Sequence, residues 1–206
     1  MTDPGHLGDP RPVGTELDRC LAAGGVVVFP TDTVYGLGCD VENPEAVRRL
    51  YALKGRPREK PAAVLWGRLE TALADLDEEL GPRTRAAVVA VLPGACTLLL
   101  PNPRRRFPLA GGEALGLRVP ATRLPDCRPL LQSSANVAGG PDPRRLDEIP
   151  TAILDGADLV LDGGELPGTP STVIDLTGFE ETGSWRLVRP GTLGPGEVAA
   201  LLGDGG

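Results

Sequence analysis

Histidine is almost missing from this sequence. His6 is the only histidine among 206 residues, and it lies in an N-terminal segment rich in proline and glycine. Catalysis by a Ser-His-Asp or Cys-His arrangement requires an imidazole that accepts a proton, and histidine is a common ligand of zinc. The sequence therefore excludes these catalytic arrangements and histidine-based zinc sites, so any chemistry has to proceed without imidazole.

Cysteine is scarce as well. The four cysteines lie far apart, and no two of them have the spacing that is typical of metal ligands: Cys20, Cys39, Cys96 and Cys127. We expect them to be reduced, partly buried thiols.

Long apolar runs and an excess of basic residues are also absent. No apolar stretch approaches the roughly 20 residues that a membrane-spanning helix needs. Residues 1–14 lack the apolar core of a signal peptide, so we interpret them as a flexible tail of a cytoplasmic protein. The formal net charge is −7, whereas a protein that binds nucleic acid through its phosphates needs a basic surface. General nucleic-acid binding is therefore disfavoured.

Short apolar runs bounded by proline and glycine predict a mixture of strands and helices. We expect strands at 26–29, 62–65, 97–100, 115–119, 130–132, 159–161, 172–176 and 185–188. We expect helices at 15–23, 43–55, 69–75, 82–92 and 195–202, and a short one at 145–149. The alternation is not strict, which favours a single α/β domain over residues 15–206, with a twisted mixed parallel and antiparallel sheet flanked by helices.

Lysine has an unusual distribution. Of 21 basic residues, 19 are arginine, and the two lysines, Lys54 and Lys60, flank Arg56 and Arg58 in the stretch KGRPREK. A compact, strongly hydrated ammonium is typical of phosphate sites. The alternative is a solvated, charged loop at the end of a helix, where cations are favourable. The composition leaves both interpretations open.

Two loops that follow predicted strands carry hydroxyl, amide and glycine groups. The stretches PTDTVYGLG (30–38) and SSANVAGG (133–140) combine polar side chains with glycines that permit close approach of a polar ligand. PTDTVYGLG is either a loop or a strand bent by Gly36 and Gly38, and a strand-turn with ordinary side-chain-to-backbone hydrogen bonds is the alternative to a ligand site there. SSANVAGG suits phosphate or ribose contacts, but it has the spacing of neither a P-loop nor a nucleophile elbow.

Two groups of arginines need separate interpretations. Arg118 lies inside the apolar run LGLRVP, where an arginine requires an anion or a carboxylate partner. The run Arg104-Arg105-Arg106 is interpreted as a solvated loop in preference to an RNA-binding patch.

Taken together, these stretches resemble the YrdC-like L-threonylcarbamoyladenylate synthases, in their short, single-domain form. The matching segments follow the order of that family and extend over roughly residues 15 to 195: PTDTVYGLG (30–38), KGRP with a following KP (54–61), PGACT (93–97), LRVP (117–120), SSANVAGG (133–140), LDGG (161–164), STVIDLT (171–177) and LVRPG (187–191).

The resemblance implies roles for individual residues. It implies catalytic contacts to the nucleotide phosphates from Lys54, Arg56, Ser134 and Asn136. It implies ATP contacts from Arg56, Lys60, Ser134, Asn136 and Arg189. It implies that L-threonine is bound by Thr33, Arg118 and Ser171. It implies that the pocket is shaped by Thr31, Tyr35 and Thr97. Two positions depart from the family pattern: Leu65 stands where many members have histidine, and Ala95 is the third residue of a PGPxT-like stretch.

The resemblance also implies the reaction. It is a nucleotidyl transfer in which L-threonine, bicarbonate or CO2, and ATP give threonylcarbamoyl-AMP and pyrophosphate, for threonylcarbamoyladenosine modification of tRNA. Mg2+ is expected on the phosphates, with no protein ligand for it assigned. A threonylcarbamoyl transferase complex acting on tRNA is the expected downstream partner, and direct tRNA binding is expected to be weak or absent.

Three other functions remain open from the residues alone. The chain could be an RNA-binding module of the same fold, an enzyme that forms a carbamoyl-adenylate from carbamoyl phosphate, or a nucleotide-binding regulator without catalysis. The acidic total and the lack of interleaved aromatic residues argue against the RNA-binding module.

Overall fold

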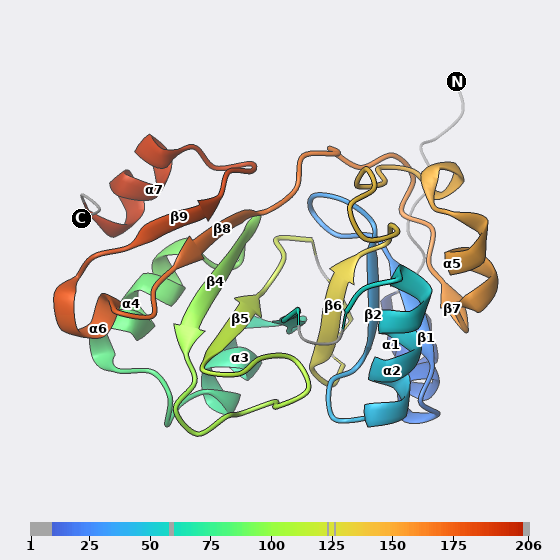
Figure 1. Ribbon diagram of the computed structural model, residues 1–206, viewed down its shortest axis with the longest axis horizontal. Helices are drawn as coiled ribbons and strands as arrows, with labels where there is room; N and C mark the ends of the chain where they lie inside the picture. Colours follow the sequence, from blue (N-terminus) through green and yellow to red (C-terminus); the bar gives the residue numbers. More distant parts are fainter. Residues whose placement is uncertain (1–9, 58–59, 123, 126, 204–206) are drawn as a thin grey trace.

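The computed structural model describes residues 10–57, 60–122, 124–125 and 127–203. One nine-stranded sheet organises these residues, in the strand order β7-β1-β2-β6-β3-β5-β4-β8-β9 (Figure 1). The strands are β1 (Val26–Phe29), β2 (Gly36–Asp40), β3 (Ala63–Leu65), β4 (Cys96–Pro101), β5 (Ala114–Arg118), β6 (Leu130–Ser134), β7 (Leu159–Val160), β8 (Thr172–Asp175) and β9 (Arg186–Arg189).

The sheet is mixed, as expected. The pairs β1–β7, β3–β5 and β4–β8 are parallel, whereas β1–β2, β2–β6, β3–β6, β4–β5 and β8–β9 are antiparallel. The helices are α1 (Pro10–Ala22), α2 (Pro44–Lys54), α3 (Leu69–Asp75), α4 (Pro82–Val91), α5 (Thr151–Gly156), α6 (Phe179–Thr182) and α7 (Pro195–Leu202), with a 3-10 turn η1 (Leu146–Glu148). No helix within the described residues is both long enough and apolar enough to span a bilayer.

Strand β1 separates two apolar clusters because its side chains alternate between the two faces of the sheet. Val26 and Val28 belong to the larger cluster, which includes the buried side chains of α2. Val27 and Phe29 belong to a smaller cluster with Leu17 of α1. Helices α1 and α2 therefore cover opposite faces of this part of the sheet, as Figure 1 also shows.

Helix α2 ends where its sequence predicts. The side chain of Asn43 accepts hydrogen bonds from two backbone N–H groups of the first turn, Pro44 occupies the first helical position, and Gly55 ends the helix with a left-handed φ of 57°. This glycine sets the path of the following loop, so it places Arg56 beyond the helix and leaves Lys54 in its last turn.

The N-terminal helix differs from the expectation. Helix α1 begins at Pro10 and not at Thr15, so residues 10–14 are helical and not part of a tail. Proline is tolerated in the first helical turn because its missing N–H would have no partner within the helix. Residues 1–9, the remainder of the predicted tail, lie outside the described residues.

Candidate active site

A cavity of about 300 Å³ lies on one face of the central strands. On β5 every second residue lines it, namely Ala114, Gly116 and Arg118, while Leu115 and Leu117 are buried in the core. The polar residues of its wall come from seven segments of the chain: Arg56, Thr97, Arg118, Gln132, Ser133, Ser134, Asp142, Ser171 and Arg189. The residues around position 56 and the turn near position 135 therefore meet at one site.

Gly116 keeps the floor of the cavity open. A Cβ atom at this position would lie 3.1 Å from Cα of Ala63 and 3.7 Å from Cγ2 of Thr97. Any larger residue would project a side chain between these strands and into the space above them, so glycine leaves room for a ligand against the backbone.

Lys54 does not line this cavity. It is 1% exposed, and its ammonium donates hydrogen bonds to the backbone oxygen of Ser134, to the backbone oxygen of Asn136 (2.8 Å) and to Oδ1 of Asn136 (2.9 Å). Its three donors are all used, so it anchors the turn that carries the cavity-lining Ser134. Burial, and after it the charge of Arg56, lower the pKa of this ammonium to about 8, while the charge of Asp142 opposes them.

Asn136 links this lysine to the wall of the cavity. Its Oδ1 also accepts from Oγ of Ser134 (2.8 Å), and its Nδ2 donates to the backbone oxygen of Gly140 (2.7 Å) and to Oδ1 of Asp142 (3.2 Å). A buried amide with both ends satisfied fixes the turn in one conformation. Ser134, held by this amide, lines the cavity.

Arg56 and Lys60, both assigned to ATP, differ in position. Arg56 lines the cavity and donates from one guanidinium nitrogen to the backbone oxygen of Pro61 (2.7 Å). Its buried Nε has no partner among residues 10–57, 60–122, 124–125 and 127–203. Lys60 is exposed and does not line the cavity. Arg56 is therefore the better-placed cation for a bound anion.

Arg118 has the carboxylate partner that its buried position demands. Its Nη2 lies 2.7 Å from Oδ1 of Asp32 and also donates to the hydroxyls of Thr33 (2.7 Å) and Thr31 (3.3 Å). The guanidinium is only 4% exposed, and its Nε is buried without a partner. Burial lowers the pKa of Arg118, and the charge of Asp32 opposes this shift. The loop 31–33 thus holds one edge of the guanidinium and leaves Nε unsatisfied.

A second polar group comes from β4, from the residue just before β8 and from β9. The hydroxyls of Thr97 and Ser171 are 3.1 Å apart, and Nη2 of Arg189 donates to the backbone oxygen (2.7 Å) and the hydroxyl (3.2 Å) of Ser171. All three residues line the cavity. They place a third arginine and two hydroxyls around the same space as Arg118.

Tyr35 shapes the site from outside the cavity. Its hydroxyl donates to Asp162 (3.1 Å) and to the backbone oxygen of Gly164 (2.8 Å), and it accepts from the backbone N–H of Gly163 (3.0 Å). These hydrogen bonds connect the LDGG segment (161–164) to the start of β2. Burial is the main reason that its pKa is raised.

Four polar residues of this region have no role predicted from the sequence: Asp32, Gln132, Ser133 and Asp142. Asp32 lies between Thr31 and Thr33, which do have predicted roles, and the need of a buried Arg118 for a carboxylate partner is the signal that points to it. Leu65, which replaces a family histidine, is fully buried in the smaller apolar cluster and does not line the cavity. The departure at Leu65 therefore leaves the cavity wall itself intact.

The arrangement is suited to binding anions. Of the three buried side-chain polar atoms without a partner in the described residues, two are the Nε atoms of Arg56 and Arg118. An unsatisfied buried guanidinium N–H carries a desolvation cost that an anionic ligand would remove. The cavity can therefore hold two anionic groups, one near Arg56 and Ser134 and one near Arg118 and Ser171.

The lowered pKa of Lys54 should make the stability of the protein depend on pH. Between pH 8 and 10.5 the folded chain binds fewer protons at Lys54 than the unfolded chain, so this residue makes the free energy of unfolding rise with pH in that window. Because the pKa is lowered to about 8, the free energy of unfolding should rise by about 3 kcal/mol over this window through Lys54. We expect Lys54→Met to lose this rise and to loosen the Ser134–Asn136 turn.

Urea unfolding of the wild type and of Lys54→Met, carried out at several pH values between 8 and 10.5, measures the free energy of unfolding of each protein. The buried thiol of Cys39, whose pKa is raised to about 12 by burial, contributes an opposite slope, but it is present in both proteins and cancels in the difference. Parallel pH profiles for wild type and Lys54→Met would contradict the prediction.

Comparisons with known proteins show which chains this one resembles. The family model named for Sua5, YciO and YrdC, described as "Telomere recombination", matches residues 19–191. A putative threonylcarbamoyl-AMP synthase of Mycobacterium tuberculosis is 34% identical over 193 residues, which cover 89% of this chain and 86% of that protein. The threonylcarbamoyl-AMP synthase of Pyrococcus abyssi is 32% identical over 193 residues, which cover 89% of this chain but 55% of that protein.

A solved structure gives the same result for the fold. The crystal structure of Pyrococcus abyssi Sua5 complexed with L-threonine superposes with a TM-score of 0.80 at 29% sequence identity. The superposition covers 95% of this chain and 58% of that one. The chain thus spans little more than half of the Pyrococcus protein but most of the mycobacterial one.

Proposed function

Since the chain belongs to the Sua5, YciO and YrdC family, we propose that it is a threonylcarbamoyl-AMP synthase. In this proposal it is a cytoplasmic nucleotidyltransferase that uses ATP, L-threonine and bicarbonate or CO2. Its product, threonylcarbamoyl-AMP, passes to a threonylcarbamoyl transferase complex that acts on tRNA.

One observation carries the proposal: two groups of arginine and hydroxyl side chains, both suited to anions, line a single cavity. Arg56 and Ser134 lie at one part of its wall, and Arg118, Ser171 and Arg189 at another. The reaction needs this arrangement, because it joins a carboxylate-bearing amino acid to a triphosphate. We propose that the first group binds the phosphates, with Lys54 and Asn136 supporting the turn, and that Arg118 binds the threonine carboxylate.

The proposed chemistry does not need histidine. The amine of threonine and CO2 form a carbamate, whose anionic oxygen attacks the α-phosphorus of ATP, and the bond to pyrophosphate breaks. The enzyme's task is to bring two anions together and to stabilise the departing pyrophosphate, which fixed cations achieve by positioning and by charge. A pair of unit charges about 4 Å apart is worth about 4 kcal/mol at an effective dielectric constant near 20.

Product analysis tests the proposal directly. The protein is incubated with ATP, L-threonine and carbon-13 bicarbonate, and the nucleotides are separated and identified by mass spectrometry. We expect threonylcarbamoyl-AMP that carries the carbon-13 label, together with unlabelled pyrophosphate. Neither product should form when threonine is omitted. Formation of an adenylate only when carbamoyl phosphate replaces bicarbonate and threonine would overturn the proposal.

A further inference from the structure

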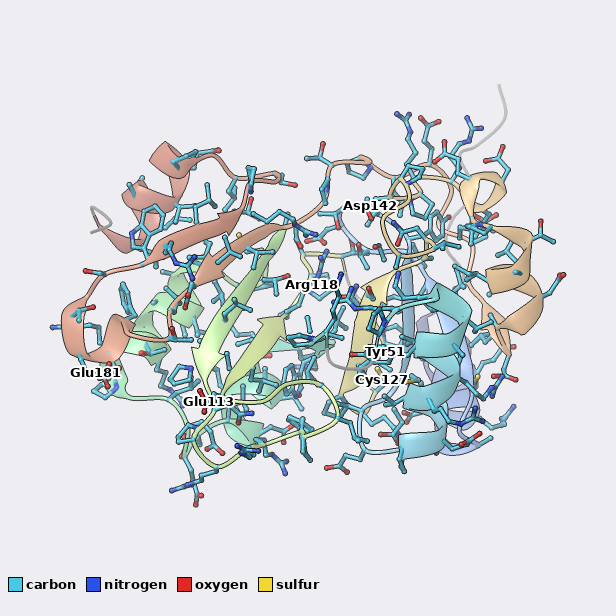
Figure 2. The ribbon with its side chains drawn as sticks, viewed as in Figure 1. Tyr51, Glu113, Arg118, Cys127, Asp142 and Glu181 are labelled. Carbon is cyan, nitrogen blue, oxygen red and sulfur yellow. The ribbon has the colours of Figure 1, made fainter. Side chains whose placement is uncertain are left out.

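A carboxylate lines the cavity that otherwise presents arginines and hydroxyls. Asp142 lies on the loop after β6, and Figure 2 labels it together with Arg118. It is half-buried, and its Oδ1 accepts a hydrogen bond from Nδ2 of Asn136 (3.2 Å). Within the described residues no ion pair engages Asp142 and no hydrogen bond is made to its Oδ2.

This carboxylate conflicts with a triphosphate in the same cavity. Two like unit charges at close range repel each other, and the effect is large where water is partly excluded. Lys54 is near enough for the charge of Asp142 to raise its pKa, but its three donors are already used by Ser134 and Asn136. A cation between Asp142 and the phosphates would turn the repulsion into a bridge.

The surrounding residues fit Mg2+ in that place. Mg2+ prefers oxygen ligands and is commonly bound by one or two carboxylates together with substrate phosphates and water. A chain of hydrogen bonds runs from Lys54 through the amide of Asn136 to Oδ1 of Asp142, so it fixes the carboxylate and leaves Oδ2 as a ligand. Independently, the buried and unpartnered Nε atoms of Arg56 and Arg118 in the same wall indicate that an anion enters here.

We propose that Asp142 is the protein ligand of the Mg2+ ion that accompanies ATP, with Asn136 as the residue that positions it. This inference rests on the proposed function, because it requires that the triphosphate occupies the cavity near Ser134. When bound there, Mg2+ would neutralise negative charge on the phosphates. Asp142 then distinguishes the magnesium complex of ATP from free ATP, which it repels.

Binding of a non-reacting nucleotide tests this without turnover. The α,β-methylene analogue of ATP cannot release pyrophosphate, and its dissociation constant is measured by calorimetry with saturating Mg2+ and with a chelator. For the wild type we expect Mg2+ to tighten binding by roughly 100-fold. In Asp142→Asn, which retains an oxygen for Asn136, we expect the benefit of Mg2+ to fall by about tenfold, a loss of about 1.4 kcal/mol.

The metal-free arm separates the two roles of the carboxylate. Without Mg2+ the Asp142→Asn variant is expected to bind the analogue more tightly than the wild type, because a repulsive charge has been removed. Asp147→Asn is the matched control: its carboxylate pairs with Arg145 on the exposed turn η1, outside the cavity, and it should behave as the wild type. An equal effect of Mg2+ on wild type and Asp142→Asn would overturn the proposal.

The outcome remains separable from the proposed function. If the wild type forms threonylcarbamoyl-AMP but Asp142→Asn keeps the full benefit of Mg2+, only the assignment of Asp142 fails. If the benefit is lost in Asp142→Asn while the wild type makes no threonylcarbamoyl-AMP, the metal ligand is supported and the proposed reaction fails.

Discussion

Replacement of Arg56 by alanine is expected to lower kcat/KM for ATP at least about 150-fold, which corresponds to 3 kcal/mol of transition-state stabilisation. The side chain lines the cavity, and its buried Nε has no partner among the described residues. The one hydrogen bond that the side chain makes within the described part of the chain runs to the nearby backbone oxygen of Pro61, so no distant contact described there is lost on its removal. We therefore expect the midpoint of thermal unfolding to be almost unchanged.

Two further variants sharpen this test. Arg56→Lys keeps the charge but loses the planar fork of donors, so it should recover only part of the lost rate. Arg48→Ala removes an arginine from the exposed side of the preceding helix α2, where it pairs with Glu45, and should leave the rate unchanged. Pyrophosphate release with saturating threonine measures all three. A wild-type rate in Arg56→Ala would exclude this residue from the phosphate site.

The sequence predicts local structure well where local chemistry determines it. Helix α2 has its cap at Asn43, proline at its first position and a glycine at its end, so its bounds follow from neighbouring residues. The four-residue helix α6 and the six-residue helix α5 were not predicted, because they are too short to show a helical period of apolar residues. The start of α1 was missed because the capping signature at Thr15 lies inside a helix that begins earlier.

The site could be predicted only in part, because its contacts join distant positions. The pattern identified Arg118 as a residue in need of a carboxylate, but Asp32 is 86 positions away, and only the fold brings them together. Lys54 likewise meets Asn136 across 82 positions, which changes its expected role from a phosphate contact to the anchor of a turn. Composition drew attention to both lysines alike, and it could not show that one is buried and the other exposed.

Threonine binding is expected to depend on Arg118 through its charge and its geometry. Loss of a buried guanidinium that binds a carboxylate costs about 2 to 5 kcal/mol, so the KM for threonine should rise at least about 30-fold in a variant that lacks it. A simple deletion is ambiguous, however, because Asp32 would then be left as an unpaired charge that is 10% exposed. Breaking a buried ion pair in this way typically destabilises a protein by about 3 to 5 kcal/mol.

A pair of variants separates threonine binding from stability. Arg118→Met removes the cation and keeps an apolar stem, whereas the double variant Asp32→Asn/Arg118→Met also removes the stranded carboxylate. We expect the double variant to regain much of the stability in urea unfolding, since no buried charge remains unpaired, but to keep the raised KM for threonine. Calorimetric titration with threonine should show the same weakening, while the affinity for ATP should change little. A double variant that is stable and binds threonine as the wild type does would show that Arg118 serves only to pair with Asp32. Another cation would then have to bind the threonine carboxylate, and Arg189, which donates to Ser171 in the cavity wall, is the candidate.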